Sequence, residues 1–317
     1  MVSGAVDDGN CGDLQRADQE GTVMVKPPET YLMDGRRFTA EELSEIQETV
    51  KLFGKLSLTE LVQTICEHMD WLTPTGTYKI DACRKLLEQL EARGKLKLPE
   101  RQQITKRPER VCLTPRSEPQ PEIVGDLPDV APVALVPVRE KDDNALWAEF
   151  VERYHYLGYK RPFGVHQRYF IRSGGGAPLG CLLMAGAAKL LAPREQWIGW
   201  TERQRLRNNH LVLNNARFLI LPWVQVKNLA SHVLAQLIRR VGDDWEKNWG
   251  YRPVLLETFV DVAQYQATCY RAANWVFLGE TTGRGRARPG KEYASSPKAL
   301  YVYPLVKDWR KRLCPDD

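Results

Sequence analysis

Two carboxylates in the last third of the chain have a spacing that could support chemistry. Glu257 lies near the end of the apolar run PVLLETFV, and Asp261 follows four residues later. Carboxylates this close could hold Mg²⁺ and activate water for hydrolysis of a phosphodiester. The structural alternative, which we favour, is that Glu257 pairs with an arginine of a basic loop while Asp261 caps the helix that follows. Both residues are named as candidates for catalysis and for metal binding.

The segment CYRAANW contains the other candidate catalytic residue, Tyr270. Its hydroxyl could attack a phosphodiester as a nucleophile if neighbouring arginines lowered its pKa. It could instead donate a proton as a general acid. A buried tyrosine can also simply pack in the core and satisfy a backbone group with its hydroxyl. The sequence alone leaves these three roles open.

Two arginine-rich segments are candidates for contact with phosphate. In TGRGRARPGK the glycines let the backbone approach an anion closely, and the arginines alternate as along an extended edge. The basic residues of this loop are Arg284, Arg286, Arg288 and Lys291. A second set with the same spacing of two, which could line the opposite wall, is Arg203, Arg205 and Arg207. We expect contacts with the DNA backbone here; the alternative is a flexible, solvated loop.

The composition is that of a folded, water-soluble protein. The chain has 317 residues, 43% of them apolar, and its 45 basic and 40 acidic residues give a net charge of +5. No apolar run approaches the roughly 18 residues that a membrane-spanning helix needs. The seven cysteines include no C-x-x-C pair, which favours reduced thiols over a zinc site. We therefore expect a cytoplasmic protein without a membrane partner.

Residues 30–100 are expected to form a winged-helix-like domain that binds DNA, after a disordered lead-in over residues 1–29. Thr39 and Ser57 each begin a Thr/Ser-x-x-Glu capping box, and a third helical segment precedes KLKLP, which alternates like a strand. The cations that could meet phosphates on either side of a groove are Lys79, Arg84, Lys85, Lys95 and Lys97. The alternative is a helical protein-interaction module with a solvated charged face.

The remainder of the chain is expected to contain a linker and an α/β domain. Residues 101–130 are rich in proline and show no periodicity, which is typical of an extended linker. Over residues 131–317, apolar runs such as ARFLILP are typical of buried strands, and a long helix is expected over residues 228–249. The order strand-helix-strand-strand-strand-helix-strand-helix-strand predicts a mixed central sheet.

The element order over residues 216–281 resembles the second half of the GNAT acetyltransferase fold. In that family a loop Arg/Gln-x-x-Gly-x-Gly/Ala holds the pyrophosphate of acetyl-CoA on its backbone N–H groups. A tyrosine in x-Tyr-x-x-x-Gly-Phe can protonate the leaving thiolate, and Tyr270 stands at that position. The loop here, QVKNLAS, has no glycine, and the side chains of Asn228 and Leu229 would crowd the pyrophosphate. We therefore expect the fold without acetyl-CoA, and Mg²⁺ is the cofactor that the carboxylates allow.

A second resemblance covers nearly the whole chain. It is carried in order by YHYLGYKRPFG, LNNARFLILP, KNLAS, ETFVD and YRAANWVFLGETTGRGR, preceded by a unit that ends GKLKLP. These motifs resemble the DruA family of Druantia anti-phage proteins, relatives of which also occur in insertion sequences, some fused to transposase domains. The resemblance implies a prokaryotic defence or mobile-element protein that acts on DNA, with partner proteins from the same system. It could cut, join or recombine DNA strands.

Two alternatives from other function classes stay open at this point. One is an acyl-CoA-dependent transferase that modifies a base or an amine. The other is a non-enzymatic scaffold that recruits partner proteins to DNA. Tyr270 would have a chemical role only in an enzyme, whereas the arginine-rich segments would serve any protein that binds nucleic acid.

Overall fold

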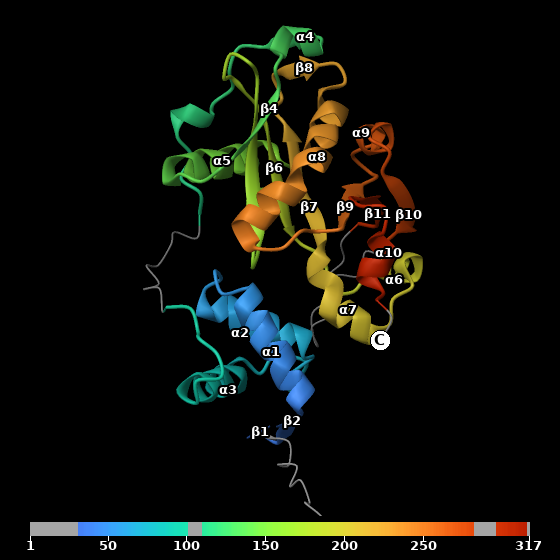
Figure 1. Ribbon diagram of the computed structural model, residues 1–317. Helices are drawn as coiled ribbons and strands as arrows, with labels where there is room; N and C mark the ends of the chain where they lie inside the picture. Colours follow the sequence, from blue (N-terminus) through green and yellow to red (C-terminus); the bar gives the residue numbers. More distant parts are fainter. Residues whose placement is uncertain (1–30, 101–109, 282–295, 316–317) are drawn as a thin grey trace, which may run out of the picture.

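The computed structural model describes residues 31–100, 110–281 and 296–315. Figure 1 shows a small helical unit, formed by the N-terminal part of the chain, below a larger unit built around one sheet. The lead-in predicted over residues 1–29 lies outside the described residues. Within the described ranges, no helix is both long enough and apolar enough to cross a membrane.

The larger unit contains a seven-stranded mixed sheet, which confirms the predicted α/β class. The strand order is β10-β11-β9-β7-β6-β5-β4, and only β7 and β9 pair in parallel. The strands are β4 (Ala134–Pro137), β5 (His166–Arg172), β6 (Pro178–Gly186), β7 (Val212–Ile220), β9 (Leu255–Asp261), β10 (Val276–Glu280) and β11 (Lys298–Pro304). Runs such as PLGCLLMAG are buried along almost their whole length, because both faces of the sheet are covered.

Helices α5 (Lys141–Tyr154) and α8 (Leu229–Trp249) cover opposite faces of this sheet. Phe170 of β5 packs edge-on against Phe150 of α5, with ring centroids 6.3 Å apart. The hydroxyl of its neighbour Tyr169 donates a hydrogen bond to Asp244 of α8. Successive strand residues point to opposite faces, so the two helices must lie on different sides. The two sides are called the α5 face and the α8 face below.

The long helix was predicted from its apolar stripe, and the stripe is buried. Leu229, Val233, Leu237 and Val241 recur at helical spacing and are at most 1% exposed. The helix ends at Gly250, which takes the left-handed conformation that favours glycine (φ 86°). α8 provides the crossover that parallel pairing of β7 with β9 requires. The short helix α9 (Thr268–Ala272) follows β9 and packs on α8.

The N-terminal unit consists of a hairpin, β1 (Tyr31–Met33) with β2 (Arg36–Phe38), and three helices. The helices are α1 (Ala40–Leu52), α2 (Leu58–His68) and α3 (Ile80–Ala92). Both predicted capping boxes form, at Thr39 and Ser57. The wing expected over residues 95–99 is absent from this described stretch, because no strand lies beside it to pair with. Over the described residues, this unit therefore lacks the paired wing strand that a winged helix has.

The N-terminal unit packs directly against the sheet domain. Phe53, at the end of α1, contacts the rings of His210 and Tyr251 edge-on, at 6.3 and 6.2 Å. Lys189 forms an ion pair with Asp70 at 2.7 Å. His210 lies in the short helix η2 (Asn209–Leu211), which follows α7 (Glu202–Asn208). The two units thus share buried contacts.

Part of the predicted linker is built into the sheet domain. Residues 101–109 lie outside the described residues, but the following stretch contains η1 (Pro115–Ser117), β3 (Ile123–Gly125) and α4 (Leu127–Val130). β3 pairs in parallel with β8 (Val224–Val226). The buried carboxylate of Glu149 accepts hydrogen bonds from the Thr114 N–H and from the hydroxyls of Thr114 and Ser117. These bonds hold the proline-rich segment against α5.

Candidate functional site

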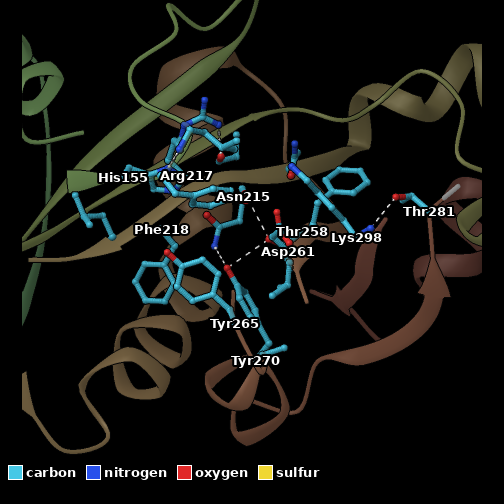
Figure 2. A pocket seen from close by; sticks show the side chains of 18 of the residues that line it. His155, Asn215, Arg217, Phe218, Thr258, Asp261, Tyr265, Tyr270, Thr281 and Lys298 are labelled. Carbon is cyan, nitrogen blue, oxygen red and sulfur yellow. Dashed lines mark hydrogen bonds between the residues drawn. The ribbon is translucent and has the colours of Figure 1, made fainter. Parts of the chain in front are cut away.

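The sheet is forked between β7 and β9. The two strands pair only over Val212–Asn215 and Leu255–Thr258, although β7 continues to Ile220 and β9 to Asp261. The pairing of β7 with β6 shifts by one residue at Ala216, which forms a β-bulge. A bulge bends a strand and increases its twist, so β7 turns away from β9 beyond this point. The space between the diverging strands is a cleft of about 1070 Å³ (Figure 2).

The bulge also gives the fork two chemically different faces. Asn215 lies opposite Met184 of β6, whereas Arg217 lies opposite the adjacent Leu183, so these two side chains point to opposite faces. Phe218 returns to the side of Asn215 and contacts the ring of Tyr270 at 6.3 Å. Figure 2 shows Arg217 and Phe218 on opposite sides of β7. The cleft therefore opens to both sides of the sheet.

Tyr270 of α9 enters the fork from the α8 face. Its ring is 7% exposed and packs against Trp275, Tyr301 and Phe218. Its hydroxyl oxygen accepts a hydrogen bond from the Asn215 amide at 3.1 Å and lies 3.3 Å from the Thr258 hydroxyl (Figure 2). Burial raises the pKa of the phenol above its usual range. A protonated phenol can donate a proton, whereas a nucleophilic role would need the pKa to fall.

The α5 face of the fork carries cations and aromatic rings. Tyr156 and Tyr265 are 37% and 50% exposed, and their ring centroids are 5.6 Å apart. Lys298 of β11 lies over the Tyr156 ring at 5.8 Å. Burial, together with the charges of Arg217 and Lys298, lowers the pKa of His155 to about 4. At neutral pH the imidazole is therefore uncharged, whereas Arg217 and Lys298 bring positive charge to this face of the cleft.

The other end of the cleft meets the N-terminus of α8. Asn228 is the N-cap residue in a left-handed conformation (φ 61°), and its side chain makes no capping hydrogen bond. Leu229 is 1% exposed and belongs to the core, while Ala230 lines the cleft. The expected crowding by Leu229 does not occur, because its side chain points away from the cleft. The first-turn N–H groups have no acceptor within the helix and lie beside the small side chain of Ala230.

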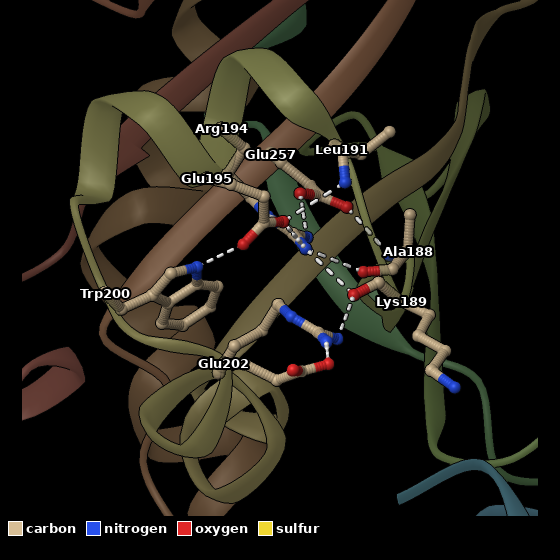
Figure 3. Close-up of polar contacts among 9 residues, drawn as sticks. Ala188, Lys189, Leu191, Arg194, Glu195, Trp200, Glu202 and Glu257 are labelled. Carbon is tan, nitrogen blue, oxygen red and sulfur yellow. Dashed lines mark hydrogen bonds and ion pairs between the residues drawn. The ribbon is translucent and has the colours of Figure 1, made fainter. Parts of the chain in front are cut away.

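Glu257 takes part in a buried ion pair instead of a metal site (Figure 3). Its carboxylate accepts from the Arg194 guanidinium at 2.7 Å and from the Ala188 N–H at 3.0 Å, and both charged side chains are fully buried. Arg194 also pairs with Glu195 at 2.7 Å. Burial alone would lower the pKa of Arg194, but the carboxylates of Glu257 and Glu195 together raise it by more. The net effect is a raised pKa, so the guanidinium stays charged. The network ties β9 to α6 (Ala192–Ile198).

The expectation of a Mg²⁺ site is corrected by this arrangement. Asp261 is 6% exposed and lines the cleft, where its carboxylate accepts from the Ser296 hydroxyl and the Ala263 N–H. Glu257 is bound to Arg194, and no group of three acidic, histidine or cysteine side chains that could hold a metal ion occurs within the described ranges. Asp261 also caps a turn at the end of β9, and α9 begins only at Thr268.

The second arginine set does not form one wall. Arg203, Arg205 and Arg207 lie on helix α7, where residues two apart point in nearly opposite directions. Arg205 is buried and donates to the Lys189 carbonyl and the Glu202 carboxylate, whereas Arg203 and Arg207 are exposed. None of the three lines the cleft. The residues of the first set, Arg284, Arg286, Arg288 and Lys291, lie outside the described residues.

The N-terminal cations are spread over different environments. Lys79 forms an ion pair with Asp34 at 2.7 Å, and the Nε of Arg84 is buried. Lys85, Lys95 and Lys97 are exposed. Their contact with DNA stays a prediction.

Several lining residues of the fork were not identified from the sequence. They are Asn215, Thr258, Arg217, Tyr156 and Lys298. A signal for three of them was present, because YHYLGYKRPFG contains Tyr156, and LNNARFLILP contains both Asn215 and Arg217. These motifs carried the family resemblance but had been assigned no chemistry.

Comparison with known proteins identifies a family over most of the chain. The family described as Druantia protein DruA matches residues 84–289. No curated protein matches the chain. This match bears out the resemblance noted in the sequence.

Solved structures similar to this chain include spermidine N-acetyltransferases from Vibrio cholerae. One, in complex with CoA and spermine, is 11% identical, with a TM-score of 0.35 over 53% of this chain and 94% of that chain. Another, in complex with manganese ions, is 12% identical, with a TM-score of 0.34 over 55% and 94%. These neighbours are GNAT-fold acetyltransferases, the fold that the element order over residues 216–281 resembles. Our expectation that acetyl-CoA would not bind is corrected at its premise, because Leu229 is 1% exposed and belongs to the core, so the crowding expected from its side chain is absent.

Proposed function

The chain belongs to the Druantia protein DruA family, and from this premise we propose that its C-terminal domain binds an acyl-CoA in the β7–β9 fork and transfers the acyl group to an amine. The observation that carries the proposal is the buried Tyr270 hydroxyl, held by Asn215 and Thr258 at the point where the strands diverge.

The fork offers backbone groups that suit the pantetheine arm of CoA. From Ala216 to Ile220, β7 has no strand neighbour on its β9 side within the described residues. An open strand edge presents N–H and C=O groups to an extended ligand with amide groups, as in β-strand addition. The pantetheine arm carries two amides and is extended and narrow. The residues present therefore fit this part of the cofactor.

The α8 end of the cleft suits the phosphates. The first-turn N–H groups of α8 point out of the helix beside Ala230, and the positive end of the helix dipole lies there. Ala230 supplies the close approach that glycine supplies in the usual loop, because the larger Leu229 side chain is turned into the core. The missing glycine is thus no obstacle to an anion at this position.

An acyl-CoA, when bound, supplies a thioester that can lose its acyl group to an amine. The residues of the chain would hold the proton and orient the groups. Tyr270 keeps a proton on its phenol because burial raises its pKa, and the two neighbours at its oxygen leave that proton free to point into the cleft. Asp261 lines the same cleft with a carboxylate that can accept a proton from an attacking amine.

Calorimetric titration of the full chain with CoA tests this proposal. We expect a saturable heat of binding that Ala230→Glu weakens by about tenfold or more, because a carboxylate would repel phosphate at the helix end. Ala230→Gln is the matched control: it adds the same volume without charge and should retain most of the affinity. A chain that shows no heat with CoA, or equal losses in both variants, would exclude the phosphate end of this cleft.

A second candidate function is binding of duplex DNA by the N-terminal unit. It is supported by Lys85 and Lys97, which are exposed and form no ion pair with a described residue. Gel shifts at increasing salt should show weakening affinity, and Lys85→Glu should weaken it further. Lys51→Glu, on the exposed surface of α1, is the control with the same charge change. Affinity that does not change with salt would overturn this candidate; the scaffold alternative would then stay a prediction.

A further inference from the structure

The α5 face of the fork carries features that an acyl-CoA does not need. We propose that this face binds a nucleobase attached to phosphate, and that the exocyclic amine of this base is the acceptor to which the proposed transfer would deliver the acyl group. The role as acceptor rests on the proposed function; the binding of the base does not. The residues that would form the subsite are Tyr156, Tyr265, Arg217, Lys298, His155 and Asp261.

The two tyrosines provide a surface for stacking. Tyr156 and Tyr265 are among the exposed large side chains of the chain, at 37% and 50%, although they stand beside a deep cleft. Their rings are inclined to each other by 55°, so they do not stack on one another, and Tyr265 is the more exposed of the two. The His155 ring stacks on Tyr156 at 4.9 Å and fixes its orientation. Exposed aromatic rings over a cationic groove are a common platform for nucleobases.

The two cations beside the rings suit a phosphate. Neither Arg217 nor Lys298 forms an ion pair with a described carboxylate, although Asp261 lies directly opposite Lys298 in the β9–β11 pairing. The Nε and Nη1 groups of Arg217 donate to the carbonyls of Gly158 and Ala216, at 3.3 and 2.7 Å. These bonds fix the guanidinium while its Nη2 makes no hydrogen bond to another described residue. A fixed guanidinium with a free donor is well suited to a phosphate oxygen.

A donor and an acceptor accompany the rings. The Leu157 N–H donates to His155 Nδ1 at 3.2 Å, which assigns the proton of the neutral ring to Nε2 and makes that atom a donor. Asp261 provides carboxylate oxygens as acceptors. A carboxylate can accept from the exocyclic amino group of cytosine or adenine, and a donor can serve a ring nitrogen or carbonyl. The pair favours a base with an exocyclic amine.

The subsite is separate from the position proposed for the cofactor. Arg217 and Asp261 lie on the α5 face, whereas Tyr270, Phe218 and Asn215 lie on the α8 face. The two sets meet only in the gap between β7 and β9. The adenine of a CoA anchored at the α8 N-terminus would therefore be at the opposite end of the cleft from Tyr156.

Fluorescence anisotropy with a labelled single-stranded oligo(dC) tests the proposal on the full chain. The comparison strand is an abasic oligonucleotide of equal length, which keeps the phosphates and removes the bases. We expect the dC strand to bind more tightly, and Tyr265→Ala to remove about fivefold or more of its affinity. Phe277→Ala is the matched control, because this ring of β10 is 54% exposed but does not line the cleft.

Further titrations distinguish a free nucleotide from a nucleic acid as the ligand. They also separate the nucleobase subsite from the proposed CoA-dependent transferase. Free CMP, titrated by calorimetry, supports a mononucleotide site if it binds as tightly as the strand; tighter binding of the strand supports a nucleic-acid site. Equal affinity for dC and abasic strands overturns the proposal, as do equal losses in Tyr265→Ala and Phe277→Ala. So does a loss of CoA affinity in Tyr265→Ala, which would assign the rings to the cofactor. Base-dependent binding by a chain that fails to bind CoA would retain the subsite and refute only the transferase.

Discussion

Asn215 and Arg217 are two residues apart on β7, yet their side chains point to opposite faces of the sheet. In a regular strand they would share one face, and the bulge at Ala216 separates them. Asn215 holds the Tyr270 hydroxyl on the α8 face, while Arg217 lies near Tyr156 on the α5 face. The one inserted residue thus has two effects. It opens the fork, and it places the Tyr270 hydroxyl and the Arg217 guanidinium on opposite faces of the sheet.

Replacing Tyr270 by phenylalanine should separate binding from chemistry. Loss of the hydroxyl removes the proton proposed for the leaving group, so release of thiol from acetyl-CoA in the presence of an acceptor amine should fall by about 10²–10⁴-fold. The Kd for CoA should stay within about twofold of wild type, because the ring and its packing remain. The free energy of unfolding should fall by about 1–3 kcal/mol, since the Asn215 amide loses a buried acceptor.

Tyr301→Phe is the control for this experiment. Its ring stacks on Tyr270 with centroids 6.1 Å apart, so the change perturbs the same cluster without removing the hydroxyl in the fork. Thiol release should be retained in this variant. Equal rates in wild type and Tyr270→Phe would show that the phenol has no part in the reaction.

Breaking the ion pair between Arg194 and Glu257 should lower the free energy of unfolding of the chain. Arg194→Met leaves the Glu257 carboxylate buried without its partner, and such a change costs about 3–5 kcal/mol. Arg203→Met is the control, since its contact with Glu41 at 3.6 Å is exposed and should contribute less than about 1 kcal/mol. Urea unfolding of both variants gives the comparison. A loss of stability in Arg194→Met as small as that in Arg203→Met would mean that water or another cation reaches Glu257.

Acid should destabilise the packing of the N-terminal unit through two histidines. Burial lowers the pKa of both His68 and His210 from 6.5 to about 4, and His210 also acts electrostatically on His68. Between these values the unfolded chain binds protons that the native chain does not, so stability falls as the pH drops from 6.5 towards 4. A pKa difference of this size corresponds to about 3 kcal/mol of stability for each ring.

Urea unfolding at several pH values measures this dependence. His210→Phe keeps a ring between Phe53 and Tyr251 and removes one titrating group, so the slope of stability against pH should become shallower below 6.5. A slope identical to that of wild type would mean that His210 is already solvated in the native chain.

The periodic parts of the fold could be predicted from the sequence. The α8 stripe, both capping boxes and the buried strands depend on local patterns of apolar residues and caps, and the structure confirms them. The wing over residues 95–99 alternates like a strand but has no neighbour to pair with. Whether an alternating segment becomes a strand depends on a partner, which lies elsewhere in the chain.

The candidate site could be predicted only in part. Tyr270 and Asp261 do line the cleft, because the end of β9 and the helix after it meet at the fork. The pairing of Glu257 depended on Arg194, which is 63 residues away and stands in no recognisable motif with it. The spacing of two in the Arg203–Arg207 set indicates a wall only on a strand, and the segment is a helix. The bulge at Ala216 has no signature in LNNARFLILP.

Amide hydrogen exchange of β7 in the presence and absence of CoA tests the central claim most directly. If CoA occupies the fork, its amides should pair with the open edge of β7, and those N–H groups of residues 216–220 that point to this edge should exchange more slowly. The paired stretch Val212–Asn215 should change little. Slower exchange confined to residues 216–220 and to the first turn of α8 is the predicted result. Binding of CoA that leaves residues 216–220 unchanged would contradict a cofactor site in the fork.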